Sequence, residues 1–302
     1  APDKAIVQAQ RGEAKSTIAC IYGVWSITQQ LPTRVMLVSA SGAKADENGV
    51  LMYGLVHNWD KLEYLIPDKS AGDRTSTSMF DIHYALKGVD KSPSVVCLGI
   101  TANLAGFSAS LLIPDDIETQ KTGGTAVQRE QLLALSKEFT AICERGRILY
   151  LGTPQSRDSI YNTLPSRGYD VRIWPGRFPT PASQEKYGQF LAPSIMERAA
   201  VLGPRCLSGG GLDGSLGWAT DPERFDEAAL QTKELDYGPE GFQLQYLLDT
   251  SLMDAARLQL KLKDLIIGDF SHDSVPEILQ WAPNPTLKLD IRDSYVPNAD
   301  LY

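Results

Sequence analysis

The sequence predicts an α/β protein with a mostly parallel sheet flanked by helices, followed by a smaller, mainly helical subdomain. Two observations support this fold class. Between residues 4 and 151, short β-rich apolar runs alternate with longer amphipathic stretches, as in repeated βαβ units. Beyond Trp174, prolines and glycines break the alternation, and the remaining stretches have helical spacing. We therefore predict a core at residues 1–174 and a helical lid and linker subdomain at residues 175–302.

Composition limits the classes of protein that fit. With 302 residues and 43% hydrophobic content, the chain is long enough for one large core or two unequal domains. No stretch approaches the ~18 apolar residues that cross a bilayer, so we expect no membrane partner. A net charge of −8 argues against a surface that coats nucleic acid indiscriminately, although a local basic patch remains compatible with it. The cysteines lack metal or redox spacing and are predicted to be reduced core residues of a cytosolic protein: Cys20, Cys97, Cys143 and Cys206.

The first functional signal is a short polar loop between an apolar run at residues 5–7 and a predicted helix at residues 15–29. A strand, a tight loop and a helix that opens on Lys15 and Ser16 form the layout of a phosphate-binding loop. In such a loop Lys15 would reach the β- and γ-phosphates, and Ser16 would bind Mg²⁺. The predicted nucleotide-binding residues are Gln10, Arg11, Gly12, Glu13, Ala14, Lys15, Ser16 and Thr17.

The loop departs from the strict phosphate-loop pattern, because Ala9 and Ala14 stand where the pattern requires glycine. A plain helix start is the alternative interpretation. The loop also begins very close to Ala1, so we expect the chain to be a fragment of a longer protein.

Acidic and polar residues follow two later apolar runs. Pro114 is followed by Asp115, Asp116 and Glu118, and the run at residues 147–151 ends in Gly152, Thr153 and Pro154. Carboxylates at the carboxyl end of a buried strand can hold Mg²⁺ and orient an attacking water, although a solvated turn is the simpler interpretation of the acids. Strands that lead into Lys-Ser, Asp-Asp and Gly-Thr-Pro, in this order, predict a P-loop NTPase sheet of the ASCE/RecA-like type.

The remaining elements are predicted from periodicity. Buried strands are expected at residues 34–38, 95–100, 109–113 and 147–151. A strand with one wet face is expected at residues 79–85, after an exposed loop that carries Arg74. Helices are expected at residues 43–59, 126–143, 183–202, 221–237 and 242–263.

These motifs resemble the ATPase portion of the large subunit of a phage terminase, a DNA-packaging motor, of the short-tailed, T-odd-like phage type. The segments that carry the resemblance are 8–17, 37–45, 92–118 and 148–155. Weaker similarity extends through residues 169–179 and 220–248, so that nearly the whole chain is covered.

The resemblance implies roles for individual residues. Arg11 would reach the γ-phosphate in cis, and Asp115 would bind Mg²⁺. Asp116 and Glu118 both qualify as the catalytic acid, and the sequence does not separate them. Thr153 would sense the γ-phosphate and relay hydrolysis to motion.

A further arginine, supplied by a neighbouring subunit, is expected in a ring ATPase, because its guanidinium stabilises charge on the transferred phosphoryl group. Arg129 is the first candidate, because a cation at the start of a helix opposes the helix dipole and is not stabilised there. Arg74 is the rival candidate. A solvated Arg129 paired with Glu130 or Lys137 is the alternative.

The function implied is an ATP- and Mg²⁺-dependent motor that moves double-stranded DNA into a procapsid in the host cell cytoplasm. The implied partners are the portal protein, the small terminase subunit and further copies in a homo-oligomeric ring, most simply a pentamer. Relatives carry a nuclease domain that this chain is expected to lack. Two alternatives remain open: a nucleotide-binding structural or regulatory ring subunit with little turnover, and a helicase-like ATPase. Unranked candidates for DNA contacts are Lys261, Lys263, Lys288 and Arg292.

Overall fold

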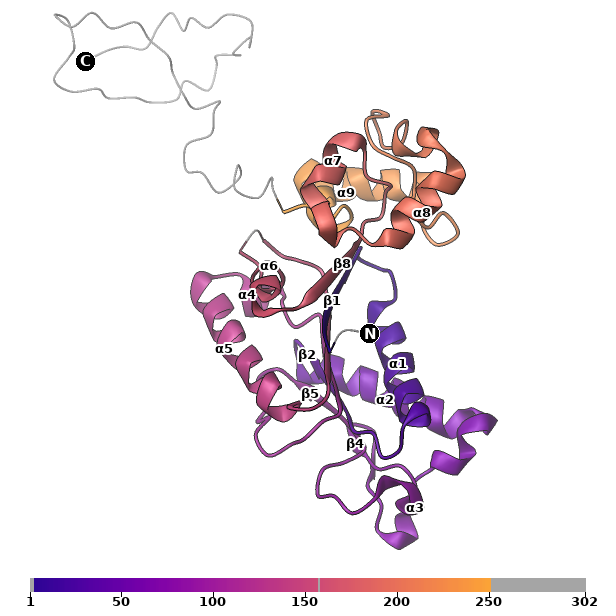
Figure 1. The fold of residues 1–302 in the computed structure, drawn as a ribbon, viewed down its shortest axis with the longest axis vertical. Helices are drawn as coiled ribbons and strands as arrows, with labels where there is room; N and C mark the ends of the chain where they lie inside the picture. The colour runs from indigo at the N-terminus through magenta and orange to yellow at the C-terminus, as the bar shows by residue number, and fades with distance from the viewer. Residues whose placement is uncertain (1–2, 157, 251–302) are drawn as a thin grey trace, which may run out of the picture. The chain divides into compact units, whose positions relative to one another are not determined.

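A sheet of eight strands runs through the computed structural model, which describes residues 3–156 and 158–250 (Figure 1). The strand order is β3-β4-β5-β2-β6-β7-β1-β8. Every pair is parallel except β3 with β4 and β4 with β5. The strands are β1 (Lys4–Ala9), β2 (Val35–Ser39), β3 (Thr75–Ser76), β4 (Met79–Phe80), β5 (Val95–Gly99), β6 (Leu111–Asp115), β7 (Arg147–Gly152) and β8 (Asp170–Trp174). The predicted mostly parallel sheet is confirmed.

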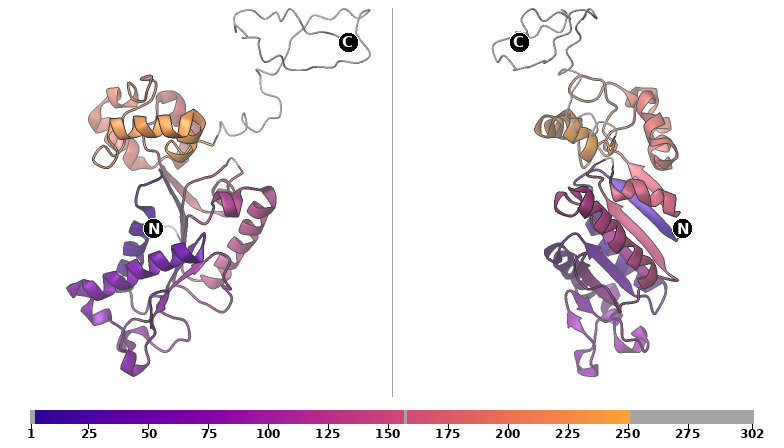
Figure 2. Two further views of the ribbon diagram at one scale, coloured as in Figure 1. Left: turned by 180° about the vertical axis from the view of Figure 1, so that it is seen from behind. Right: turned by 90° about the vertical axis from the view of Figure 1, so that its left-hand side faces the viewer.

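Helices cover both faces of this sheet, with α1 and α2 on one face and α5 on the other (Figures 1 and 2). Buried residues of the strands alternate between the two faces: Leu37 and Ile113 pack under α1 and α2, whereas Met36 and Leu112 pack under α5. The helices of this part are α1 (Lys15–Gln29), α2 (Gly42–Asn58), η1 (Asp60–Leu65), η2 (Lys69–Ala71), α3 (Tyr84–Lys87), α4 (Gln120–Gly123), α5 (Ala126–Ile142), α6 (Ile160–Thr163) and η3 (Leu164–Arg167).

Parallel pairing brings the last residues of several strands to one edge of the sheet. Ser39 pairs with Asp115, Asp115 pairs with Leu151, and Gly152 pairs with Gln8. Strand β7 lies between β1, which leads into the polar loop, and β6, which ends in the aspartates. The three sequence signals therefore meet at the carboxyl edge.

Strand β6 begins and ends two residues later than the strand predicted at residues 109–113. It includes Pro114, which lies in the interior of the sheet and pairs with Val38 of β2. The recorded pairing with β7 skips Ile113 and Pro114, since proline has no N–H to donate to that ladder.

The predicted strand at residues 79–85 is wrong beyond Phe80. The buried carboxylate of Asp81 accepts hydrogen bonds from the Arg74 backbone N–H, the Arg74 guanidinium and the Lys87 ammonium, which turns the chain away from the sheet. His83 then caps α3 by accepting from the Ala85 N–H.

The part after β8 consists of helices and turns, but their bounds differ from those predicted. The helix expected at residues 183–202 is broken into two by Gly188, which has a positive φ of 52°, and by Pro193. The helix expected to begin at Asp221 begins at Glu227 and contains a non-helical residue, Gly238. The elements are α7 (Pro181–Tyr187), η4 (Gly188–Phe190), α8 (Pro193–Leu202), η5 (Pro204–Leu207) and α9 (Glu227–Gln245).

The helix predicted at residues 242–263 ends at Gln245. Residues 246–250 form a turn and irregular chain, so the predicted helix is wrong there. The part predicted at residues 251–263, the end of the lid and linker subdomain and the four candidate DNA-contacting cations lie outside the described residues, and the core boundary at Trp174 stays a prediction. All four cysteines are buried and free, as predicted. Among residues 3–156 and 158–250, no helix is both long and apolar enough to span a bilayer.

Candidate nucleotide-binding site

The polar loop connects β1 to α1 through two left-handed residues. Gly12 has a φ of 87° and Ala14 a φ of 53°. Ala14 is the N-cap of α1 and offers no side-chain hydrogen bond, so no capping side chain occupies the first backbone N–H groups of the helix. Such an uncapped helix start favours an anion.

Ala14 carries a cost that the sequence did not locate. The sequence shows only that alanine replaces the glycine of the phosphate-loop pattern. The structure shows that Ala14 adopts a left-handed backbone conformation, which costs an L-residue roughly 1–2 kcal/mol of stability. Glycine at this position would avoid that cost.

Lys15 is folded back onto the loop. Its ammonium donates to the carbonyl oxygens of Ala9 and Gln10, each at 3.1 Å. Burial lowers the pKa of Lys15, and the negative charges of Asp116 and Asp115 partly oppose this. The cation therefore has only neutral hydrogen-bond partners while two carboxylates lie near it.

Asp115 is the most exceptional acid of the site. Only 4% of the residue is exposed, its Oδ2 accepts from the Asn48 amide at 3.2 Å, and its Oδ1 has no hydrogen-bond partner in the described structure. Burial raises its pKa, which the Ser16 hydroxyl and Asn48 partly counter. An unpartnered buried carboxylate oxygen beside a hydroxyl suits a hard cation such as Mg²⁺.

The two candidate catalytic acids have different surroundings. Asp116 is half-buried, has a φ of 43°, and is held by a hydrogen bond from its N–H to the Leu151 carbonyl at 2.8 Å. Its charge is the largest opposing influence on the pKa of Lys15, so it acts on the loop.

Glu118 is 1% exposed, and both carboxylate oxygens accept hydrogen bonds from the segment after β7. Oε1 accepts from the Gln155 N–H at 3.2 Å, and Oε2 accepts from the Ser159 hydroxyl at 3.0 Å and the Ile160 N–H at 2.7 Å. Burial raises the pKa of Glu118, against the effect of these hydrogen bonds. In this structure Glu118 holds the segment at residues 155–160.

Thr153 joins the strands of the site. Its buried hydroxyl donates to the Ala9 carbonyl at 3.2 Å, which is also the carbonyl that accepts from Lys15. One backbone oxygen therefore connects the end of β7 with the ammonium of the loop.

The three candidate arginines are placed differently. Arg11 is exposed, and its N–H donates to the Gln245 carbonyl at 3.0 Å. Arg129 has a side chain only 12% exposed, and it donates to the Gly123 carbonyl and pairs with Asp158. The expectation that local stability gives Arg129 no role is therefore wrong, and neither Glu130 nor Lys137 is its partner. Its guanidinium joins the turn before α5 to the segment after β7.

Arg74 lies away from the loop of its own chain. It belongs to the amino end of the sheet, where its guanidinium donates to Asp81 at 3.1 Å and to the Lys91 carbonyl at 2.6 Å.

Two contacts of the loop were not predicted. The Arg224 guanidinium donates to the Gly12 carbonyl at 2.8 Å, and the Phe225 ring lies where a side chain on Gly12 would be. Asn48 was also missed. The sequence signal for Asn48 was a polar residue on the buried side of α2. Arg224 and Phe225 lay in a segment with only weak similarity to the terminase family.

The parallel sheet, the loop before α1 and the strand order define an α/β fold of the P-loop NTPase type, as predicted. No family model matches the chain. The chain is 36% identical over 303 residues to the terminase large subunit of Enterobacteria phage T3, across 99% of this chain and 49% of that protein. It is thus related over nearly its whole length to a phage terminase large subunit, which confirms the resemblance, and it spans about half the length of that relative.

Two solved structures show a weaker likeness. The large terminase ATPase domain of Thermus phage P74-26 has a TM-score of 0.42 at 10% identity, covering 83% of this chain and 90% of that chain. The HK97 bacteriophage large terminase has a TM-score of 0.41 at 17% identity, covering 66% of this chain and 43% of that chain. At these scores the likeness supports no argument about function.

Proposed function

We propose that this chain hydrolyses ATP and thereby drives double-stranded DNA into a procapsid, as the motor part of a terminase large subunit. The observation that carries the proposal is the meeting of Lys15, Ser16 and the unpartnered Oδ1 of Asp115 beside an uncapped helix start. These groups come from helix α1 and strand β6, and together they fit a nucleotide phosphate and its cation.

The proposed roles follow from this arrangement. The loop 10–17 would hold the phosphates through backbone N–H groups, and Lys15 would exchange its carbonyl partners for phosphate oxygens. Asp115 and Ser16 would hold Mg²⁺, which when bound neutralises charge on the phosphate oxygens. Within the described ranges no group of three or more His, Cys, Asp or Glu side chains could hold a metal. One carboxylate and one hydroxyl suffice, since Mg²⁺ bound to a nucleotide takes its other ligands from phosphates and water.

For the acid that orients the attacking water, we propose Asp116 rather than Glu118. Asp116 influences Lys15 directly, whereas both oxygens of Glu118 are occupied by the segment at residues 155–160. Glu118 and Thr153 would then transmit the state of the site to the segments after β7.

The decisive measurement is steady-state ATP hydrolysis by Lys15→Ala. Because the variant loses a phosphate-pairing cation from a preformed loop, we expect hydrolysis to fall at least ~100-fold with the fold retained. Lys61→Ala removes an exposed cation of η1 and should leave the rate unchanged. Hydrolysis at the wild-type rate in Lys15→Ala would reject the site. Binding of ATP without turnover in the wild type would indicate a structural ring subunit, and strand separation would indicate a helicase.

Packaging also needs partners. We propose double-stranded DNA, a portal protein, a small terminase subunit and further copies of this chain in a pentameric ring, acting in the host cell cytoplasm. The support is the relationship to the phage T3 protein.

We further propose Arg129 as the arginine acting in a neighbouring subunit, with Arg11 acting in cis. For Arg129 this requires release from the Gly123 carbonyl and Asp158. In rings that mix Arg129→Ala with Lys15→Ala subunits, activity should partly recover, because some interfaces combine an intact loop with an intact arginine. The Arg74→Ala ring is the control with normal hydrolysis. No recovery in rings shown to contain both variants would reject the role in trans.

A further inference from the structure

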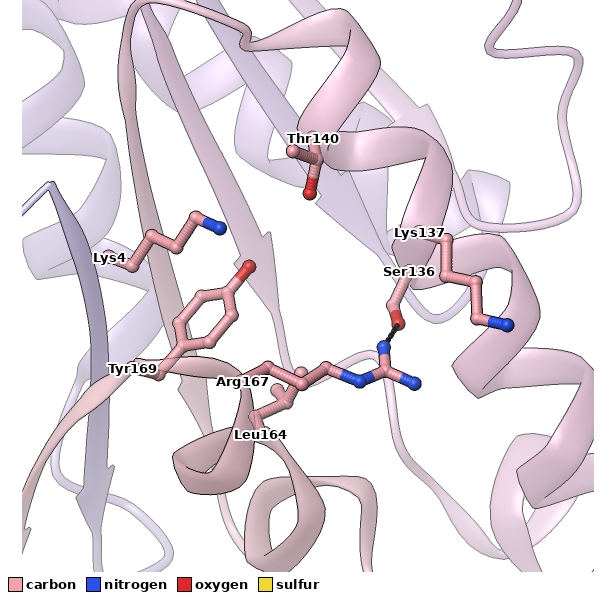
Figure 3. A pocket seen from close by; sticks show the side chains of 7 residues that line it. All are labelled: Lys4, Ser136, Lys137, Thr140, Leu164, Arg167 and Tyr169. Carbon is pink, nitrogen blue, oxygen red and sulfur yellow. Dashed lines mark hydrogen bonds between the residues drawn. The ribbon is translucent and has the colours of Figure 1, made fainter.

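A second polar pocket lies at the other end of the sheet from the nucleotide-binding site. It has a volume of about 250 Å³ and lies between α5, η3 and the starts of β1 and β8 (Figure 3). Its lining residues are Lys4, Ser136, Lys137, Thr140, Leu164, Arg167 and Tyr169. Lys4 is the first residue of β1, whereas the phosphate loop follows the last, about 16 Å further along the strand at ~3.3 Å per residue.

The pocket is positively charged and uncompensated. Lys4, Lys137 and Arg167 line it, and no acidic residue does. None of these three cations forms a salt bridge with a carboxylate of residues 3–156 or 158–250. In a chain with a net charge of −8, Lys4 and Arg167 line this pocket without a counter-charge, and a bound anion would supply one.

Hydroxyl groups complete the lining. Ser136 and Thr140 come from α5, and Tyr169 points its hydroxyl into the space beside the Lys4 ammonium (Figure 3). Behind them lies the fully buried Tyr150, whose ring centre is 5.3 Å from that of Tyr169. Burial raises the pKa of both Tyr150 and Tyr169, so their hydroxyls remain protonated donors at neutral pH.

The cations are also held in place. The Arg167 guanidinium donates to the Ser136 hydroxyl at 3.4 Å, and the Lys4 ammonium lies 5.5 Å from the centre of the Tyr169 ring. Figure 3 shows Arg167 reaching across to α5 while Lys137 extends along the outer side of that helix. A site whose donors are already oriented loses less entropy when it binds.

We propose that this pocket binds a phosphate group, carried either by the DNA backbone or by a free phosphorylated ion. Its volume is below the ~300–1,000 Å³ of pockets for drug-sized ligands and well above the ~30 Å³ share of one water, which suits a tetrahedral oxyanion with a few waters. Arginine, lysine and hydroxyl donors without a competing carboxylate form the donor set that phosphate oxygens prefer. This binding site is separate from the proposed site of ATP hydrolysis.

The experiment compares two doubly substituted chains that lose the same charge, both in the Lys15→Ala background so that the nucleotide-binding site does not contribute. Lys4→Gln with Arg167→Gln removes two cations of the pocket, and Lys61→Gln with Arg198→Gln removes two exposed cations elsewhere. One arm measures binding of a short DNA duplex over a range of salt concentrations, and the other measures binding of inorganic phosphate.

We expect the pocket variant to bind at least one of these probes at least ~5-fold more weakly than the control variant. If the duplex is the ligand, the slope of log affinity against log salt should fall by about 1–2, since each lost phosphate contact contributes roughly 0.9. A loss confined to the duplex identifies the DNA backbone as the source, a loss confined to phosphate identifies a free ion, and either result supports the pocket.

Equal affinities of the two variants for both probes would overturn the proposal, as would equal losses, which indicate a general effect of charge. Thermal unfolding confirms that each variant is folded. If the double pocket variant does not fold, Lys4→Gln alone replaces it, with Lys61→Gln as its control. The same two outcomes then decide the question.

Discussion

Two charged clusters lie at opposite ends of the same sheet, and they treat their charges in opposite ways. At the amino end, the Lys87 ammonium lies 2.7 Å from Asp73 and 3.0 Å from Asp81, and Asp81 also pairs with Arg74 at 3.1 Å. At the carboxyl end, Lys15 donates only to backbone carbonyls although carboxylates are near. We call the first cluster closed, because its charged side chains pair with one another. We call the second cluster open, because the hydrogen-bond partners of Lys15 there are neutral carbonyls.

The pKa directions express the same contrast. Burial would raise the pKa of Asp73 and lower that of Lys87, but their hydrogen bonds and opposite charges outweigh it, so the pKa of Asp73 is lowered and that of Lys87 is raised. At the carboxyl end burial prevails, so the pKa of Lys15 is lowered and that of Asp115 is raised. Charges that pair directly stabilise the fold, whereas the buried charges at the carboxyl end belong to a candidate ligand site. Arg74 belongs to the first kind.

The largest expected effect is on the closed cluster. Lys87→Met removes the cation shared by Asp73 and Asp81 and leaves two buried carboxylates with fewer partners, so we expect the free energy of unfolding to fall by about 3–5 kcal/mol. Denaturant unfolding measures this loss. ATP hydrolysis by the folded fraction should keep its wild-type kcat.

The matched control is Lys44→Met, whose partner Glu47 is mostly exposed, so that about 0.5 kcal/mol or less should be lost. Similar losses in the two variants would contradict a difference between closed and exposed pairs.

The next effect separates the two acids after β6. Asp116→Asn should lower kcat at least ~100-fold, about 2.7 kcal/mol, while nucleotide binding and stability stay close to wild type. Asparagine also tolerates the positive φ of 43°, so the backbone need not change. Single-turnover hydrolysis and a nucleotide-binding titration measure the two parts.

Glu118→Gln is the comparison variant. A Gln amide places a donor against the N–H and hydroxyl donors of residues 155–160, so its main effect should be a loss of about 1–3 kcal/mol in stability. The assignment fails if Glu118→Gln loses hydrolysis at unchanged stability while Asp116→Asn stays active.

Much of the fold could be predicted from the sequence, although the closed cluster of Asp73, Asp81 and Lys87 was not. Apolar runs such as residues 34–38 and 147–151 identified the buried strands, and the alternation with helices identified the parallel sheet. Lys15, Asp115 and Thr153 each lie at or just after the end of a predicted strand. Because parallel strands end at the same edge of a sheet, the sequence was enough to predict that these residues meet there.

Long-range partners could not be predicted. The sequence could not show that Glu118 faces residues 155–160, that Arg129 pairs with Asp158, or that the Ala9 carbonyl serves both Lys15 and Thr153. These contacts depend on how loops fold back after the strands, which periodicity does not encode. The same limit applies to β8, whose pairing with β1 was not foreseen.

A smaller effect tests whether the buried charge of Asp115 lowers the stability of the fold. Asp115→Asn should abolish hydrolysis yet raise the free energy of unfolding by about 1–3 kcal/mol at neutral pH, because it removes the charge on a buried oxygen that has no partner. The folded-state pKa of Asp115 is raised above its ordinary 3.8, so the cost of the carboxylate accumulates between pH 3.8 and the folded-state pKa and is complete above it.

The gain of the Asn variant should therefore shrink as the pH falls through that interval. Thermal unfolding at neutral and at acidic pH measures it. A gain that is independent of pH, or a loss at neutral pH, would show that Asp115 is not destabilised by its charge.

The smallest effect concerns the backbone of the loop. Ala14→Gly removes a left-handed cost of roughly 1–2 kcal/mol but adds about 0.4–1 kcal/mol of unfolded-state entropy, so the net gain in stability should be about 1 kcal/mol or less. If the methyl also crowds a phosphate, ATP binding should tighten modestly, and a titration separates the two effects. Gly12→Ala is the opposite variant, because its added methyl would lie 2.8 Å from Phe225 at a φ of 87°, and it should lose at least ~1 kcal/mol. If stability rises without tighter ATP binding, the cost of Ala14 lies in its backbone alone. If neither stability nor ATP binding changes, the left-handed turn is accommodated elsewhere in the loop.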